Sequence, residues 1–346
     1  MSRKPTAPAR ASAKAKPAAK PAADDRVRLE IEFDRPQLLG ALFGQYDTNL
    51  IAIENRLGVY IAARGERLSI EGEAESAARA RDVITGLYNR LAQGQRVDVG
   101  DVEGAISLSN DPSLEGLVKA DEGGSAPVVI RTRRKTIVPR SPTQVRYIEA
   151  LASADVIFAL GPAGTGKTYL AVAQAVSQLV AGSVDRLILS RPAVEAGERL
   201  GFLPGDMKEK VDPYLRPLYD ALYDMLPAEQ VERRIASGEI EIAPLAFMRG
   251  RTLASAFIIL DEAQNTTPLQ MKMFLTRFGQ GSRMVVCGDP NQVDLPDPAK
   301  SGLADAVRRL DGVPGIATLR FNSSEVVRHP IVGRIVDAYE GPDALR

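Results

Sequence analysis

Apolar and polar residues alternate from Val27 to Phe33, which is the pattern of a half-buried β-strand. Helical and alternating spacings follow in the order helix, helix, strand, strand, helix, over Pro36–Phe43, Thr48–Leu57, Val59–Ala63, Arg67–Ile70, and from about Glu73 to Gly94. This order predicts a small α+β domain over residues 25–94.

The run Asn49–Val59 leads from a helix into a strand, and with this element order it resembles a KH domain, a reader of single-stranded RNA. A KH domain holds the nucleic-acid backbone with a GXXG loop between its first two helices. Here Gly44–Asp47 stands at that place, and the Asp47 carboxylate would repel phosphate. Two interpretations stay open: RNA binding, or a scaffold for oligomer or partner contacts.

Apolar residues thin out between Gln93 and Ala126 while Gly, Asp and Ser accumulate, which predicts a connector with a short helix. We therefore assign residues 95–140 to a linker. It ends in a basic patch, Arg131–Lys135 together with Arg140. That patch is either a solvated run of charge or a nucleic-acid contact.

A continuous apolar run, Val156–Leu160, precedes a glycine-rich loop and then a helix with apolar residues on one face. The loop consists of Gly161, Pro162, Ala163, Gly164, Thr165, Gly166, Lys167 and Thr168. Glycines let backbone N–H groups point at phosphate oxygens, and the helix N-terminus adds its positive dipole end. Lys167 would reach the β and γ phosphates, and Thr168 would offer its hydroxyl to Mg²⁺. The segment predicts binding of ATP with Mg²⁺.

Asp261 and Glu262 follow another apolar run, Ala256–Leu260, at the expected tip of a neighbouring strand. Asp261 would hold the metal ion. Glu262 would orient and deprotonate the attacking water, as a hydrolase requires. This second carboxylate favours hydrolysis over a small-molecule kinase.

Two amides complete the expected site. Gln292 follows the apolar run Met284–Cys287 and would sense the γ-phosphate, while Gln144 precedes the first strand of the core and would read the adenine edge. Reading of that edge favours ATP over GTP.

From about Ser141 to the C-terminus the chain resembles the PhoH family. The matching motifs are Gln144, Gly161–Thr168, Ser190–Glu195, Gly197–Asp206, Asp261–Gln264, Gly288–Gln292 and Arg328–Pro330. The resemblance implies a RecA-like P-loop ATPase over residues 141–346, similar to the first motor domain of superfamily 1 helicases. It has three layers and a mostly parallel sheet, so the fold class is α/β. It also implies an RNA-linked ATPase and a metal-dependent endoribonuclease as partner, in ribosomal RNA processing or RNA remodelling. A slow nucleotide switch or scaffold is the alternative.

Superfamily 1 motors bury ATP between two motor domains, whereas this chain offers one after Ser141. A second copy is the economical source of the other wall, and repeated head-to-tail contacts close into rings. We expect a homo-oligomer, a hexameric ring, in which an arginine acts on the phosphates of its neighbour. The candidates are Arg328, Arg249 and Arg251.

Composition limits the class of protein and the kinds of site that the chain can contain. The 346 residues suffice for two folded units, and 45% hydrophobic with 25% charged residues is ordinary for a globular protein. Residues 1–24 form a basic, Ala/Pro-rich tail that we expect to be disordered. His329 is the only histidine, so a histidine metal site is not expected, and the only cysteine, Cys287, lies in an apolar run. No apolar stretch reaches the roughly 18 residues that span a membrane, which predicts a cytoplasmic protein.

Overall fold

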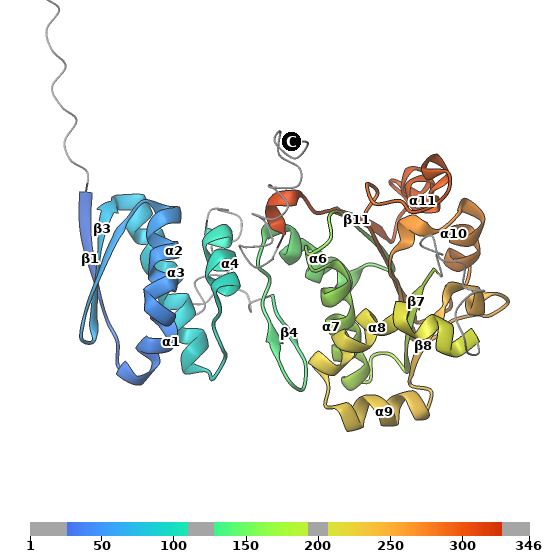
Figure 1. Ribbon diagram of the computed structural model, residues 1–346, viewed down its shortest axis with the longest axis horizontal. Coiled ribbons are helices and arrows are strands. Elements are labelled where there is room, and N and C mark those ends of the chain that lie inside the picture. Colours follow the sequence, from blue (N-terminus) through green and yellow to red (C-terminus); the bar gives the residue numbers. More distant parts are fainter. Residues whose placement is uncertain (1–25, 110–127, 193–206, 327–346) are drawn as a thin grey trace, which may run out of the picture.

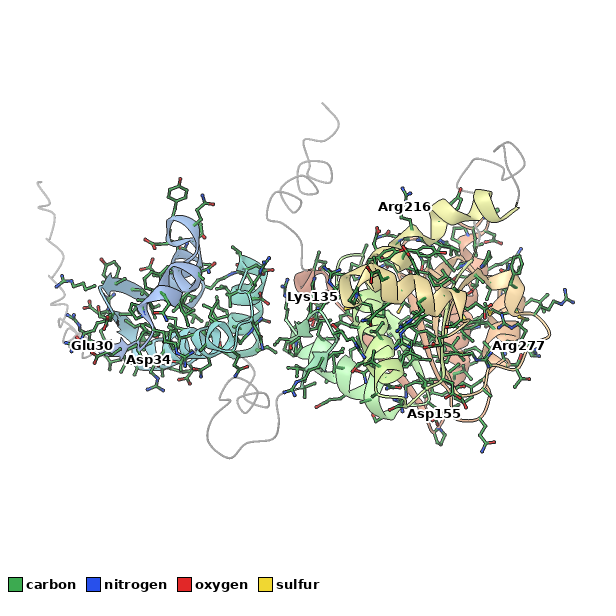
Figure 2. The ribbon with its side chains drawn as sticks, turned by 90° about the horizontal axis from the view of Figure 1, so that it is seen from below. Glu30, Asp34, Lys135, Asp155, Arg216 and Arg277 are labelled. Atoms are coloured by element: carbon green, nitrogen blue, oxygen red, sulfur yellow. The ribbon has the colours of Figure 1, made fainter. Side chains whose placement is uncertain are left out.

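The computed structural model describes residues 26–109, 128–192 and 207–326. Two folded units lie side by side, and helix α4 (Val99–Ser109) and the hairpin of β4 (Ile130–Arg131) and β5 (Thr136–Ile137) stand between them (Figure 1). Figure 2 shows Lys135 at the border between the units, and Glu30 and Asp34 far from it. The predicted basic tail, Arg328 and His329 fall outside the described residues.

The N-terminal unit has the predicted order of elements. Its strands and helices are β1 (Arg26–Glu32), α1 (Leu39–Phe43), α2 (Thr48–Leu57), β2 (Tyr60–Arg64), β3 (Arg67–Glu73) and α3 (Ala74–Ala92). The strands form an antiparallel sheet in the order β1-β3-β2. Gly58 ends α2 at φ 67° and so turns the chain into β2, a conformation that glycine adopts without steric cost.

Helix α4 belongs to this unit, although it lies in the stretch assigned to the linker. It packs against α2 and α3, and Val102 and Ile106 are buried in the same core as Ile53 and Ile84. The packed unit therefore continues to Ser109 rather than ending at Gly94. The signal is weak in the sequence because α4 is short and its apolar residues are interleaved with Gly, Asp, Glu and Ser.

The C-terminal unit is built on a parallel sheet. Within the described ranges its strands stand in the order β11-β6-β10-β9-β7-β8. Their bounds are β6 (Val156–Leu160), β7 (Arg186–Arg191), β8 (Ile240–Pro244), β9 (Ala256–Leu260), β10 (Arg283–Gly288) and β11 (Ile316–Arg320). The central strands are apolar throughout because both faces of the sheet are covered.

Helices cover both faces. The bounds of the helices are α6 (Pro142–Ser153), α7 (Lys167–Val180), α8 (Met207–Met225), α9 (Ala228–Ala236), α10 (Pro268–Leu275) and α11 (Gly302–Leu310). Alternate residues of one strand enter different cores: Ile157 packs with α6, α7 and α8, whereas Phe158 packs with α10 and α11. The predicted three-layer α/β fold is thus confirmed. Across the described ranges, none of the helices combines the length and apolarity needed to cross a bilayer.

Local signals in the sequence set the helix starts. Ser141 accepts a hydrogen bond from the backbone N–H of Gln144 and Pro142 begins α6; Thr267 and Gln270 form a reciprocal capping box on α10. Cys287 is buried in β10, and burial raises the pKa of its thiol to about 12, which agrees with the predicted strand position.

Candidate functional site

The glycine-rich loop joins β6 to α7 at the carboxyl edge of the sheet. The backbone N–H of Gly161 donates to the carbonyl of Gly288 at 3.1 Å. A Cβ at Gly161 would lie 2.4 Å from the carbonyl oxygen of Phe321, so only glycine fits between the ends of β10 and β11. The loop is therefore anchored at its start by the two strands that flank β6.

Lys167 is the first residue of α7, and its ammonium is folded back on the loop. Nζ donates to the carbonyls of Gly161 at 2.6 Å and Pro162 at 2.8 Å. Burial lowers the pKa of Lys167 below its usual range. Phosphate oxygens would be stronger partners for this cation than the two neutral carbonyls.

Thr168 and Asp261 meet at the start of α7. The Thr168 hydroxyl donates to Oδ1 of Asp261 at 2.6 Å, and burial raises the pKa of Asp261 above its ordinary value. Strand β10 lies between β6 and β9, so Asp261 stands on the next strand but one, not on the neighbouring strand that the sequence suggests. All parallel strands end at the same edge, which explains why the two residues still touch. One carboxylate and one hydroxyl oxygen fit Mg²⁺, which usually keeps several of its waters.

Glu262 follows Asp261 in a left-handed backbone conformation, φ 51° and ψ 39°. Both carboxylate oxygens are held: Oε1 lies 3.3 Å from a guanidinium nitrogen of Arg191, and Oε2 accepts from the Gln264 amide at 2.5 Å. The carboxylate is thereby fixed beside the loop.

Arg191 and Gln264 were not assigned roles from the sequence. Arg191 ends β7 and also donates to the carbonyl of Tyr214 on α8 at 3.1 Å. Gln264 uses its amide oxygen to accept from the backbone N–H of Asp289, at the end of β10. The available signal for Arg191 was its place directly after the apolar run of β7, at the same edge as Asp261.

A cleft of about 660 Å³ opens between these groups, bordered by the glycine-rich loop, Arg191, Asp261, Glu262 and Gln292. Gln292 is exposed on the turn after β10. The structure thus gathers the loop, Thr168, Asp261, Glu262 and Gln292 around one cleft, whose size suits a small ligand.

Gln144 lies beside the loop, but its amide is already bonded to the protein. It is buried in α6, donates to the carbonyl of Thr165 at 3.0 Å and accepts from the backbone N–H of Arg140 at 2.7 Å. Adenine recognition by Gln144 stays a prediction. A second cleft of about 1070 Å³ borders Gln144, Gly164, Gly166 and Tyr169 and extends to the N-terminal unit.

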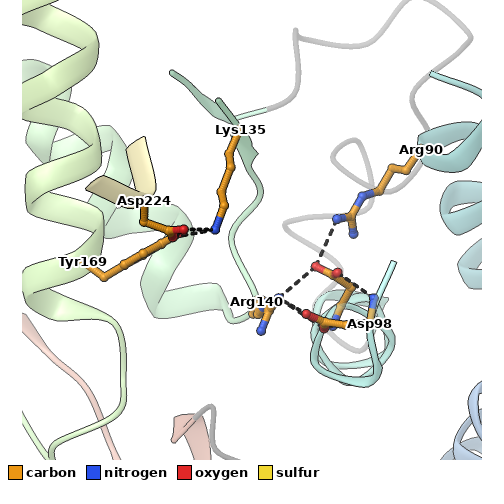
Figure 3. A network of polar contacts seen from close by, with 7 residues as sticks. Arg90, Asp98, Lys135, Arg140, Tyr169 and Asp224 are labelled. Atoms are coloured by element: carbon orange, nitrogen blue, oxygen red, sulfur yellow. Dashed lines mark hydrogen bonds and ion pairs between the residues drawn. The ribbon is translucent and has the colours of Figure 1, made fainter. Parts of the chain in front are cut away.

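The basic patch is partly structural. Lys135 contacts both carboxylate oxygens of Asp224 at 2.5 Å, and the Tyr169 hydroxyl donates to the same carboxylate at 2.8 Å (Figure 3). Arg134 donates to the carbonyl of Tyr223 at 2.6 Å. These contacts fasten the β4-β5 hairpin to α7 and α8, while Arg133 is exposed.

The arginine candidates for contacts between copies differ in their surroundings. Arg251 forms a two-pronged pair with Glu241 at 2.6 and 2.7 Å. Arg249 is exposed beyond β8, the edge strand. Arg328 lies outside the described residues.

Comparison with known proteins finds one family and several relatives of high coverage. The chain matches the family described as "PhoH-like protein" over residues 136–340. It is 49% identical over 300 residues to a "PhoH-like protein" of Bacillus subtilis, covering 87% of this chain and 93% of the relative. A "PhoH-like protein" of Mycobacterium tuberculosis H37Rv is 48% identical over 320 residues, covering 92% of this chain and 89% of the relative. Among solved structures, a Sulfolobus solfataricus SWI2/SNF2 ATPase core in complex with dsDNA matches 52% of this chain and 44% of that chain at 15% identity, with a TM-score of 0.31. That likeness is too low to carry an argument.

Proposed function

This chain belongs to the PhoH family, and on that premise we propose that it binds ATP with Mg²⁺ and hydrolyses it. The observation that carries the proposal is the contact between Thr168 and Asp261 at 2.6 Å, made at the first turn of α7 directly beside Lys167. A phosphate loop, a buried carboxylate and a hydroxyl meet there as a Mg²⁺–triphosphate site requires.

Each residue has a role in binding. The backbone N–H groups of Gly164 to Lys167 and the dipole of α7 hold the phosphates, and Lys167 turns from its two carbonyl partners to the β and γ oxygens. Thr168 and Asp261 would hold the metal ion. When bound, Mg²⁺ supplies positive charge to the β and γ phosphate oxygens.

Glu262 serves the hydrolytic step. Its carboxylate, held by Arg191 and Gln264, orients a water whose oxygen forms the new bond to the γ phosphorus while the bond to the ADP oxygen breaks. The proton of that water passes to the Glu262 carboxylate. Gln292, across the cleft, contacts the γ-phosphate and so reports its presence to the turn after β10.

The test is phosphate release by purified full-length chain with ATP and Mg²⁺, compared with Lys167→Ala and with Lys272→Ala. Lys272 is an exposed lysine of α10, away from the cleft, and serves as the matched control. We expect release from the parent and from Lys272→Ala, and none above background from Lys167→Ala. Equal release from all three proteins would place the activity elsewhere.

We also propose that this ATPase acts on RNA through its N-terminal unit. Support comes from the KH-like order of elements and from two exposed aromatic side chains, Tyr46 at the loop before α2 and Tyr60 on β2, which could stack on bases. Single-stranded RNA should then raise the ATPase rate, and Tyr46→Ala with Tyr60→Ala should remove the stimulation without changing the basal rate.

The alternative is a slow nucleotide switch or scaffold for a partner endoribonuclease that depends on metal. The same two contacts bear on it: if Arg191 and Gln264 keep both oxygens of Glu262 engaged when nucleotide is bound, the carboxylate cannot take the proton of water and hydrolysis is slow. Nucleotide-dependent capture of such a nuclease, without stimulation by RNA, would support the switch over the motor.

A further inference from the structure

Helix α4 of the N-terminal unit rests directly on the backbone of Arg140, just before α6. A Cβ added at Gly104 would lie 2.8 Å from Cα of Arg140 and 2.9 Å from its Cβ, so glycine is what permits this approach. The contact joins the two folded units at a backbone position, not only through flexible side chains.

Ion pairs also join Arg140 to the N-terminal unit. The guanidinium of Arg140 lies 3.1 Å from Asp98 and 3.2 Å from Asp101, and Asp101 also pairs with Arg90 of α3 at 3.0 Å (Figure 3). The Asp101 side chain is only 10% exposed. Burial alone would raise the pKa of Asp101, but the two guanidinium groups and a backbone N–H outweigh it and lower the pKa. This pairing is therefore less screened by solvent than a surface pair.

Arg140 in turn touches the element that fixes the glycine-rich loop. Its backbone N–H donates to the side-chain oxygen of Gln144 at 2.7 Å, and the other end of that amide donates to the carbonyl of Thr165 at 3.0 Å. Gln144 and Thr165 are both buried, and a Cβ at Gly166 would lie 3.2 Å from the Gln144 nitrogen. Because these groups are buried and closely packed, a shift of the backbone at residue 140 would be transmitted to the loop.

We infer that the N-terminal unit positions the phosphate loop: α4 seats Arg140, Arg140 orients the Gln144 amide, and Gln144 holds the loop at Thr165. Gln144 is on this view a positioning residue. The inference rests on the nucleotide site proposed above. Because coupling between two sites is reciprocal, a ligand that fixes the loop also favours the seating of α4 on Arg140.

The sharpest test is Gly104→Ala. Alanine favours a helix more than glycine does, so the change suits α4 itself but drives a methyl group against Arg140. The matched control is Gly40→Ala in α1 of the same unit, where the added methyl group meets nothing within 4 Å. Calorimetry on the full chain should show ATP affinity reduced about fivefold or more by Gly104→Ala, the lower range of measured couplings, and unchanged by Gly40→Ala.

A second ligand separates an effect on the glycine-rich loop from an effect on the binding of adenine. Inorganic tripolyphosphate lacks the base and ribose but should bind the same loop. If α4 acts through the loop, Gly104→Ala weakens tripolyphosphate and ATP by the same factor. Weakening of ATP alone would overturn the inference, because the effect would then arise in the cleft beside Tyr169 and Gly164.

A double-mutant cycle tests the route through the amide. With Gln144→Ala present, Gly104→Ala should have no further effect on tripolyphosphate affinity, since the connection is already cut. Additive effects would refute the route. Asp101→Asn keeps the shape of the side chain but weakens the pair with Arg140, and it should reproduce part of the loss of affinity. It provides an independent test if Gly104→Ala does not fold.

The result also separates this inference from the function itself. If the parent chain binds neither ATP nor tripolyphosphate, the proposed nucleotide site is wrong. If the parent binds both, and Gly104→Ala and Asp101→Asn bind them as tightly, the site stands and the positioning by α4 is refuted.

Discussion

The guanidinium of Arg191 lies 3.3 Å from Oε1 of Glu262, which ties the end of β7 to the residue after β9. The amide of Gln264 donates to the other carboxylate oxygen at 2.5 Å. The proposed base is thus held by two residues that are themselves fixed, Arg191 by the carbonyl of Tyr214 and Gln264 by the backbone N–H of Asp289.

Arg191→Met removes one of these supports while keeping much of the apolar stem. We expect turnover to fall roughly ten- to hundredfold because a loosened base spends less time aligned with water, with a smaller change in the KM for ATP. Arg191→Lys should be intermediate. Steady-state phosphate release at saturating ATP measures the effect. An unchanged kcat in Arg191→Met would mean that the ion pair does not orient the base.

Glu262→Gln keeps the size of the side chain but removes its ability to accept a proton. Turnover should fall by about 10² to 10⁴, the usual contribution of a general base, while calorimetry finds ATP affinity unchanged. Glu229→Gln, an exposed residue in the first turn of α9, serves as the control. Retention of full activity in Glu262→Gln would move the base to another residue.

Asp261 links stability to pH. Its pKa in the folded chain is raised above the ordinary 3.8 by burial, so the folded chain binds the Asp261 proton more tightly than the unfolded chain does. The resulting stability is full below pH 3.8 and is lost as pH rises through the folded pKa. In the absence of Mg²⁺, Asp261→Asn should therefore raise the melting temperature at neutral pH, by an increment that shrinks toward pH 4. Added Mg²⁺ with ATP should stabilise only the parent.

Lys167 should make nucleotide binding take up protons in alkaline buffer. Burial lowers the pKa of Lys167 in the free chain below its usual 10.5, and phosphate oxygens would raise it again on binding. Calorimetry in two buffers of different ionisation enthalpy reports the proton count. Uptake should grow as pH rises toward the ordinary lysine pKa, and uptake that does not change with pH would argue against a lysine contact to the phosphates.

An active site shared between copies can be tested by mixing two inactive chains. Arg249 is exposed beyond β8, whereas Arg251 is paired with Glu241. Of these two arginines, Arg249 is therefore the one more available to contact a neighbouring copy. Mixing Arg249→Ala with Lys167→Ala should restore activity at about a quarter of the interfaces in a head-to-tail ring. The same test with Arg328→Ala and with Arg251→Ala completes the set.

Failure of all three mixtures to regain activity, or a fully active monomer by light scattering, would exclude a site completed by a neighbouring copy.

The fold was largely predictable because most elements have a local signal. Val156–Leu160 and Ala256–Leu260 are continuous apolar runs, which buried parallel strands require, and Thr267-Pro268 marks a helix start. The order of strands has no such signal, so the placement of β10 between β6 and β9 could not be anticipated. The short helix predicted in the connector is α4, but its packing was not anticipated: Val102 and Ile106 join the N-terminal core, and Gly104 lies against Arg140.

The candidate site divides in the same way. The residues Lys167, Thr168 and Asp261 are encoded by spacing within short segments, and the structure brings them together. Arg191 reaches Glu262 only because β7 and β9 pair in parallel register, with Ser190 opposite Leu260. No spacing along the chain encodes that contact. The same holds for the amide of Gln144, whose partner carbonyl lies in the loop at Thr165.

Glu262 sits in the left-handed region at φ 51°, a conformation that costs a residue with a side chain roughly 1–2 kcal/mol relative to the right-handed one. Glycine or asparagine would occupy this position with less strain. A library of variants sorted only for thermal resistance should therefore discard the glutamate early, and the survivors would be more stable proteins that lack the proposed base. Engineering of this chain for robustness has to exempt residue 262 from selection.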